Sequence, residues 1–500
     1  MEGPLMLPML VLVPLIGAAV TLFLGGERSK YARIAAFAFG IVPLAMCVPI
    51  LMSGDMSEYD FSAEWISAAN LRMGIDLTVD GLSVLMVLLT AFLVPVVIAF
   101  SYKESDRPNY FYTLLLAIEV GLMGVYLSAD YFLFYVMWEV SLIPMYFLIS
   151  WYGGPRRHYS AIKFFIYTHV ASLVMLIGIF ALAFEAASIR GTGVVDFGFA
   201  AVNAAAPAFG TLFSTLVFGL LFFGFAVKMP AVPFHTWLPD AHTEAPTAGS
   251  VLLAGVMLKM GSYGIIRVCM ENFGTSPDVV DVWQPIMLFM GLLAMVYGAY
   301  ACIAQRDLKK MVAYSSISHM GLVMVAMGCF SETGTEFAVF QMFAHGLISA
   351  MLFMVCGAAG HNFGTREIPL LGGMASRVPK YAAFTMFAFM ASLGLPGLIG
   401  FWGEFGIVYA FTDWAVESDA VYLIVFCLLT LLLTAGYYIW AMQRALFGRL
   451  TDRLDFAHVH DLDLVECVAL GAVALLVVIF GFWPDLALHY IGLYPFLGVI

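Results

Sequence analysis

Long apolar runs separated by short polar connections make up almost the whole chain. An apolar run of about 18 residues or more is long enough to cross the roughly 30 Å hydrocarbon core of a bilayer as a helix. Runs of this kind predict about fourteen transmembrane helices, near residues 3–24, 30–52, 79–101, 110–128, 130–150, 160–186, 208–236, 246–270, 281–303, 307–330, 335–360, 380–411, 421–447 and 465–490. The expected fold class is therefore all-α, a polytopic membrane protein with one integral membrane domain over residues 1–500.

Composition agrees with this assignment and excludes several other classes of protein. Of the 500 residues, 62% are hydrophobic and only 11% are charged, a proportion that a soluble core cannot bury. The chain has no basic tract or motif typical of nucleic-acid binding. Its 7 cysteines are scattered through apolar runs without a CxxC pair, so we expect small core residues and neither metal nor iron–sulfur ligands. The first run follows Met1-Glu2-Gly3 without a basic residue, which favours a retained helix over a cleaved signal.

The basic residues predict the orientation of the helices. Most of the 22 lysines and arginines fall in every second loop, whereas Lys228, Lys259 and Arg267 lie within spans. The positive-inside rule places those loops in the cytoplasm and both termini on the periplasmic side. The longer outer connections, 53–78 and 187–207, are expected to be surface segments without an assigned function.

Two predicted helices are interrupted at membrane depth. In helix 7 an apolar segment ends at Lys228 and is followed by Pro230 and Pro233, and helix 12 contains Gly394-Leu395-Pro396-Gly397 shortly before Glu404. Proline removes a helix hydrogen bond, and broken helices are tolerated where they line a polar cavity. The two breaks are five helices apart, which predicts inverted repeats of helices 4–8 and 9–13. The corresponding regions are 1–109 for the first three helices, 110–270 and 281–447 for the repeats, and 448–500 for helix 14.

Ionisable residues recur at the middle depth of the predicted membrane. Glu119 and Glu139 each lie ten residues from the turn at Ala129, about 15 Å along a helix and half the hydrocarbon thickness. The same arithmetic applies to the two lysines and the two histidines of later hairpins. Such residues mark proton or ion pathways by default. The candidate row consists of Glu139, Lys228, Lys259, His319, His345 and Glu404, with Glu119 as a further candidate.

Each candidate also has a purely structural interpretation. The carboxyls can be buried in neutral form, and Lys228 can be a lysine that reaches the interface from a helix end. The histidines can pack helix against helix. Ligation of a haem by these histidines has no supporting motif.

The chain resembles one known family over nearly its whole length, and three stretches carry the resemblance most clearly. Residues 228–246 read KMPAVPFHTWLPDAHTEAP, residues 306–321 read RDLKKMVAYSSISHMG, and residues 345–350 read HGLISA. These motifs are similar to those of the antiporter-like, proton-pumping subunits of respiratory complex I, the NADH:quinone oxidoreductase. Two features favour one member of this family over its sister subunits. Glu404 stands where the sisters usually carry lysine, and the chain is expected to end after helix 14.

The resemblance implies a function and a role for each candidate. Glu139 and Lys228 would form a switching pair, Lys259 the central relay, His319 and His345 the conduit, and Glu404 the terminal proton donor or acceptor. The chain would be a translocase subunit in a bacterial inner membrane, beside sister subunits and lipid. Flavin, iron–sulfur clusters and quinone would be held elsewhere in the complex. The alternatives are the large subunit of a multi-subunit Na⁺/H⁺ antiporter, a membrane-bound hydrogenase, and a passive scaffold.

Overall fold

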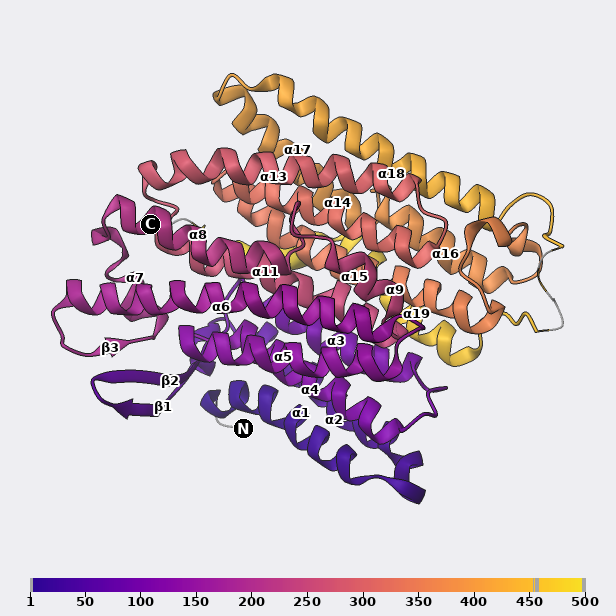
Figure 1. Cartoon of the computed structure of the whole chain (residues 1–500), viewed down its shortest axis with the longest axis horizontal. Coiled ribbons are helices and arrows are strands. Elements are labelled where there is room, and N and C mark those ends of the chain that lie inside the picture. Colours follow the sequence, from indigo (N-terminus) through magenta and orange to yellow (C-terminus); the bar gives the residue numbers. More distant parts are fainter. Residues whose placement is uncertain (1–2, 453, 455–457, 497–500) are drawn as a thin grey trace.

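The computed structural model describes residues 3–452, 454 and 458–496, and its long helices run nearly parallel to one another (Figure 1). Within those residues, 12 helical stretches are long and apolar enough to cross a membrane. Helix α3 and the interrupted pair α16 and α17 account for the two remaining predicted spans. The long helices are α1 (Met6–Phe23), α2 (Ala32–Met52), α3 (Val84–Phe100), α4 (Pro108–Leu127), α5 (Tyr131–Tyr152), α6 (Arg157–Arg190), α8 (Thr211–Lys228), α13 (Pro277–Ile303), α14 (Leu308–Gly328), α15 (Glu332–Phe363), α18 (Ile424–Ala445) and α19 (Leu464–Phe482).

Both predicted helix breaks are confirmed. Helix α8 ends at Lys228, and the chain resumes as the short helix α9 (Trp237–Glu244), whose Trp237 indole N–H donates to the Val227 carbonyl at 3.0 Å. The second break separates α16 (Pro379–Ser392) from α17 (Ile399–Glu417). The boundaries of the two repeats stay a prediction.

The span after the first break lies at the centre of the bundle and is irregular. It runs through α10 (Thr247–Leu252), a π turn over Leu253–Met257, α11 (Leu258–Gly264), a second π turn over Ile265–Met270, and α12 (Glu271–Phe273). The apolar core of this stretch is fully buried, as is that of α15 beside it. The Ala254 carbonyl, which lies in the first π turn, accepts a hydrogen bond from Lys259 Nζ. Single π turns occur often at functional sites, and nothing in the sequence pattern predicted them.

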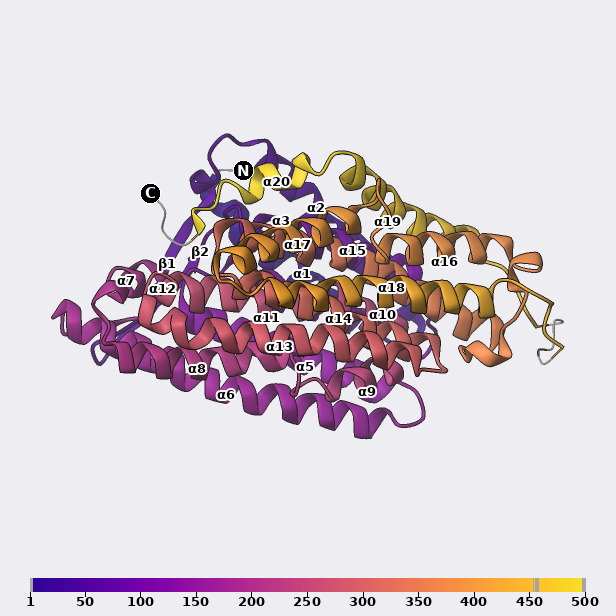
Figure 2. The ribbon, with the colours of Figure 1, turned by 90° about the horizontal axis from the view of Figure 1, so that it is seen from above.

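A small sheet covers one end of the bundle, in connections for which the sequence predicted only surface segments. Strands β1 (Phe61–Ala68) and β2 (Leu71–Leu77) pair antiparallel, and β3 (Val195–Asp196) joins β2 in parallel. Arg72 fixes this arrangement through ion pairs with Asp76 and Asp196. The first described residues and the terminal helix α20 (Asp485–Ile491) lie toward the same end (Figures 1 and 2).

Arg267, the third basic residue predicted within a span, belongs to a separate cluster toward the sheet. Its Nη2 donates to both carboxylate oxygens of Asp80, at 2.6 and 2.7 Å, and its Nη1 lies 3.7 Å from Glu271. It also lies over the rings of Tyr263 and Tyr494. A buried arginine with this many partners is a fixed structural charge, so we place it outside the candidate row.

Candidate functional site

Four candidate residues from four helical segments form a continuous chain of contacts in the core. Lys259 Nζ on α11 lies 2.8 Å from His345 Nδ1 on α15. The ring of His345 lies 5.4 Å from that of His319 on α14, measured between centroids. His319 Nδ1 is 3.5 Å from a carboxylate oxygen of Glu404 on α17. The sequence did not order the two histidines, and the structure places His345 next to Lys259 and His319 next to Glu404.

Hydroxyl groups extend this chain on the α16 and α18 side. Ser392 Oγ lies 3.4 Å from His319 Nε2 and 2.7 Å from Tyr438 Oη. Tyr438 Oη in turn donates to Ser315 Oγ at 3.1 Å. We did not predict Ser392 or Tyr438, because they are single polar residues on two helices remote in sequence from the motifs. The network gives His319 a partner on each ring nitrogen.

The second helix break positions Glu404. Gly394 has a φ of +77° at the end of α16, a left-handed conformation that favours glycine. A Cβ atom at this position would lie 2.4 Å from a carboxylate oxygen of Glu404. The break therefore allows the backbone to pass directly beside the carboxylate, and a side chain there would displace it.

Replacing Gly394 by alanine is expected to impair proton transfer through Glu404. The change adds about 1–2 kcal/mol of backbone strain and forces the carboxylate away from His319. Gly397→Ala is the matched control, because Gly397 also has a positive φ (+91°) but its nearest neighbour is the Phe482 ring at 3.6 Å. Proton pumping by the assembled complex should fall clearly more for Gly394→Ala than for Gly397→Ala. Equal losses would mean that backbone strain alone matters.

Lys228 lies at the first break without a hydrogen-bond partner in the part of the chain that the structure describes. Its side chain is buried at the end of α8, and Nζ lies 5.5 Å from the Trp138 ring centroid and 5.6 Å from that of Phe164. Aromatic faces at this distance attract a cation but cannot accept a proton. An ammonium held this way is free to change its partner.

Glu139 is not paired directly with Lys228 in this structure. One carboxylate oxygen is 3.0 Å from His169 Nδ1, and the other accepts from the Ser172 hydroxyl; both partners lie on α6. The side chain of Glu139 is directed toward α6 rather than toward α8, so the predicted switching pair is separated. His169 and Ser172 were missed by sequence reasoning, although their spacing of three residues near the middle of a long helix was a usable signal.

Glu119 lies apart from the other candidates, against α2. It is fully buried, and neither carboxylate oxygen has a hydrogen-bond partner among the described residues. A Cβ atom on Gly40 would lie 3.6 Å from one of these oxygens. The equal depth of Glu119 and Glu139 therefore does not bring them into one contact chain.

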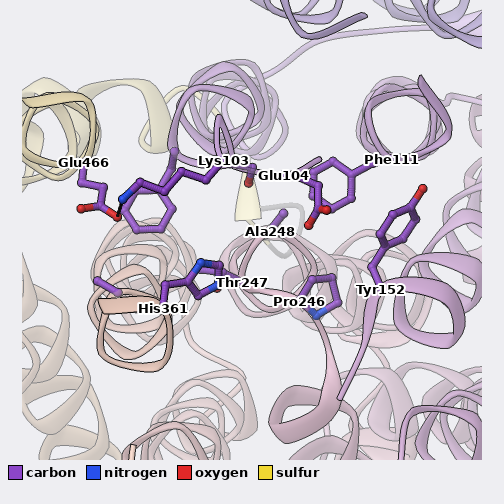
Figure 3. A pocket seen from close by; sticks show the side chains of 12 residues that line it. Lys103, Glu104, Phe111, Tyr152, Pro246, Thr247, Ala248, His361 and Glu466 are labelled. Atoms are coloured by element: carbon purple, nitrogen blue, oxygen red, sulfur yellow. Dashed lines mark hydrogen bonds and ion pairs between the residues drawn. The ribbon is translucent and has the colours of Figure 1, made fainter. Parts of the chain in front are cut away.

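A cavity of about 160 Å³ opens at the end of the bundle that carries the basic loops. Figure 3 shows Lys103 directed toward Glu466 on one wall, with Glu104, Tyr152 and Pro246 on the other. Lys103 Nζ lies 2.8 Å from Asp463 and 3.1 Å from Glu466. Partial burial alone would raise the pKa of Asp463. The hydrogen bonds from the Glu466 backbone N–H and from Lys103 outweigh this effect and lower the pKa to about 2. The cavity has both polar and apolar walls and reaches the start of α10, which leads to Lys259.

Among the residues described, no group of three or more His, Cys, Asp or Glu side chains is arranged to hold a metal ion. The groups that the contact chain and its hydroxyl extension bring together are an amine, imidazoles, a carboxyl and hydroxyls. These groups accept and release protons, and the contact chain gives them a common path.

Comparison with known proteins gives consistent matches. Residues 128–434 match the family model described as NADH:quinone oxidoreductase/Mrp antiporter, TM. F(420)H(2) dehydrogenase subunit M of Methanosarcina mazei is 39% identical over 95% of this chain and 94% of that protein. NADH-quinone oxidoreductase subunit M of Escherichia coli K12 is 36% identical over 96% and 95%. A chain in the structure of respiratory complex I from Thermus thermophilus with bound NADH superposes with a TM-score of 0.85, at 25% identity over 98% of this chain and 100% of that chain.

Proposed function

We propose a mechanism for this chain from the premise that it belongs to the NADH:quinone oxidoreductase/Mrp antiporter transmembrane family. It is a proton-translocating membrane-arm subunit of NADH-quinone oxidoreductase, similar to subunit M, and it assembles with other membrane-arm subunits, antiporter-like ones included. The observation that carries the mechanism is the unbroken contact chain from Lys259 to Glu404.

Protons move along this chain in balanced steps between neighbouring groups. The Lys259 ammonium gives a proton to His345 Nδ1 and becomes a neutral amine. His345 and His319 exchange a proton through their adjacent rings or a water molecule, and the His319 imidazolium protonates the Glu404 carboxylate. Lys259 is then recharged from Lys228. Among the described residues, the Lys228 ammonium is attracted by the aromatic faces of Trp138 and Phe164 and by the more distant Glu139 carboxylate.

Electrostatic coupling of Lys228 to Glu139 is of the right size to drive this transfer. Two unit charges attract by about 4 kcal/mol at 4 Å and about 2 kcal/mol at 8 Å when the effective dielectric constant is near 20. Moving one proton across about 150 mV requires about 3.5 kcal/mol. A change in the charge of Glu139, or in its distance from Lys228, therefore changes the free energy of protonating Lys228 by an amount comparable to the free energy needed to move one proton across the membrane.

The cavity beside the start of α10, whose lining includes the ionisable residues Lys103, Glu104, His361 and Glu466, is the proposed route for proton uptake. It lies at the end with the basic loops, which the positive-inside rule places in the cytoplasm, with both termini periplasmic in a bacterial inner membrane. Flavin, iron–sulfur clusters and quinone are proposed to reside on other subunits. The similarity to a subunit named for F(420)H(2) suggests that those subunits, and not this chain, select the electron donor.

A vesicle assay separates this function from sodium/proton exchange. Vesicles carrying the complex should acidify on addition of NADH, a protonophore should abolish the signal, and removing sodium should leave the rate unchanged. Vesicles from a strain lacking this subunit provide the control. Ion exchange that follows a sodium gradient without NADH would assign the chain to the antiporters instead.

A further inference from the structure

The strongest unassigned feature is an ionisable pair on the outer surface at the middle depth of the membrane. Glu139 and His169 are 3.0 Å apart, and their side chains are 17% and 35% exposed. Glu139 lies near the centre of α5 (Tyr131–Tyr152), so the pair is remote from both membrane surfaces. The four residues of the contact chain, by contrast, are buried in the core.

The surroundings of the pair are apolar. Along α6, the neighbouring outward residues Ile166, Val170 and Leu173 are 54%, 52% and 44% exposed. Phe165 stacks on the His169 ring with centroids 5.1 Å apart. Lipid tails suit the aliphatic residues but cannot satisfy an imidazole or a carboxyl, and ionisable residues at this depth face protein or water.

His169 has one ring nitrogen to offer outward. Nδ1 is taken by Glu139, and the described part of the chain provides no hydrogen-bond partner for Nε2. Nε2 is not one of the buried polar atoms without a partner, and the His169 side chain is 35% exposed, so Nε2 reaches the surface. A partner that packs on α5 and α6 and carries a protonatable side chain would complete its bonding. The aliphatic residues around it would form the dry part of the same contact.

We propose that His169 carries protons between Glu139 and a second membrane-arm subunit that packs on α5 and α6. The proposal rests on the proposed function and adds to it the handover point and the facing chemistry, a carboxyl or amine at the same depth. A proton donated to Nε2 forms the imidazolium, which releases its Nδ1 proton to the Glu139 carboxylate. The ring then holds one proton on Nε2, and the reverse steps discharge Glu139.

This step links the neighbouring subunit to Lys228. Protonation of Glu139 removes the negative charge that supports the Lys228 ammonium, so the lysine then releases its proton toward Lys259. The titratable groups around the pair are Tyr135 on α5 and Lys228 on α8, and both interact with the charge of Glu139. Discharge of Glu139 restores the charge and allows Lys228 to be reloaded.

His169→Gln and His169→Leu in the assembled complex test the proposal. Glutamine can still donate to Glu139 but cannot carry a proton, whereas leucine does neither. Both variants should lower NADH-driven proton pumping about fivefold or more, which corresponds to about 1 kcal/mol in the barrier. The matched control is His158→Gln on the same helix, where the ring pairs with Ser150 near the bundle end.

The outcomes distinguish the alternatives. Normal pumping by His169→Gln with loss in His169→Leu would show that His169 only positions Glu139, and normal pumping by both would remove it from the mechanism; either result overturns the proposal. If both variants fail to assemble, a photo-reactive amino acid at Val170 decides. Cross-linking to another membrane-arm subunit is the expected result, and cross-linking to lipid alone would overturn it. Loss of pumping in core variants such as Lys259→Met is independent of all these results.

Discussion

Replacing Lys259 by methionine is expected to abolish most proton pumping while the complex still assembles. Methionine fills nearly the same volume, but it cannot receive a proton from Lys228 or give one to His345, 2.8 Å away. The only route from the first half of the chain to the histidines that we identify among the described residues passes through this amine. NADH-driven acidification of vesicles should fall about tenfold or more, equivalent to at least about 1.4 kcal/mol in the transfer barrier.

The control for Lys259→Met is the same substitution at Lys30, an exposed residue outside the contact chain. Lys30→Met should pump normally. The amount of complex on native gels separates a transfer defect from an assembly defect. Full pumping by Lys259→Met would show that the buried amine serves only helix packing, and the proposed mechanism would fail with it.

Sequence reasoning located the candidate row because depth follows from simple arithmetic. A constant rise per residue converts the distance from a turn into a height in the membrane, and that placed Lys259, His319 and His345 at one level. Glu404 was identified from the helix break that precedes it. Proline and glycine marked both helix breaks. These signals are local, so a single chain was sufficient to read them.

The contacts of Glu139 could not be read in the same way. Depth does not fix the rotation of a helix about its axis, and it is this rotation that directs the carboxylate of Glu139 to His169 instead of to Lys228. The π turns around Lys259 depend on packing against α15, which leaves no mark in the hydrophobic pattern. The strands at the bundle end were missed for a related reason, since short segments of eight and seven residues carry a weak signal beside long apolar runs.

Glu404→Gln is expected to stop proton delivery at the far end of the row. The amide occupies the same space between Gly394 and His319 and can still hydrogen-bond to the ring, but it cannot take up the imidazolium proton. Pumping should fall about tenfold or more, which again corresponds to at least about 1.4 kcal/mol in the transfer barrier. The same change at Glu417, an exposed residue at the end of the same helix, should have no effect.

The comparison of Glu404→Gln with Glu404→Lys separates two roles of this position. A lysine can carry a proton, so partial pumping by Glu404→Lys together with none by Glu404→Gln would show that the site needs a titratable group of either charge type. Loss in both would show that it needs a carboxylate, because His319 at 3.5 Å delivers its proton to an acceptor that starts with a negative charge. We expect loss of pumping in both variants. A lysine ammonium is repelled by the neighbouring imidazolium, and because it already carries its proton it cannot accept another from His319. Normal pumping by Glu404→Gln would place the end of the path elsewhere, with the hydroxyls of Ser392 and Tyr438 as the remaining connection from His319.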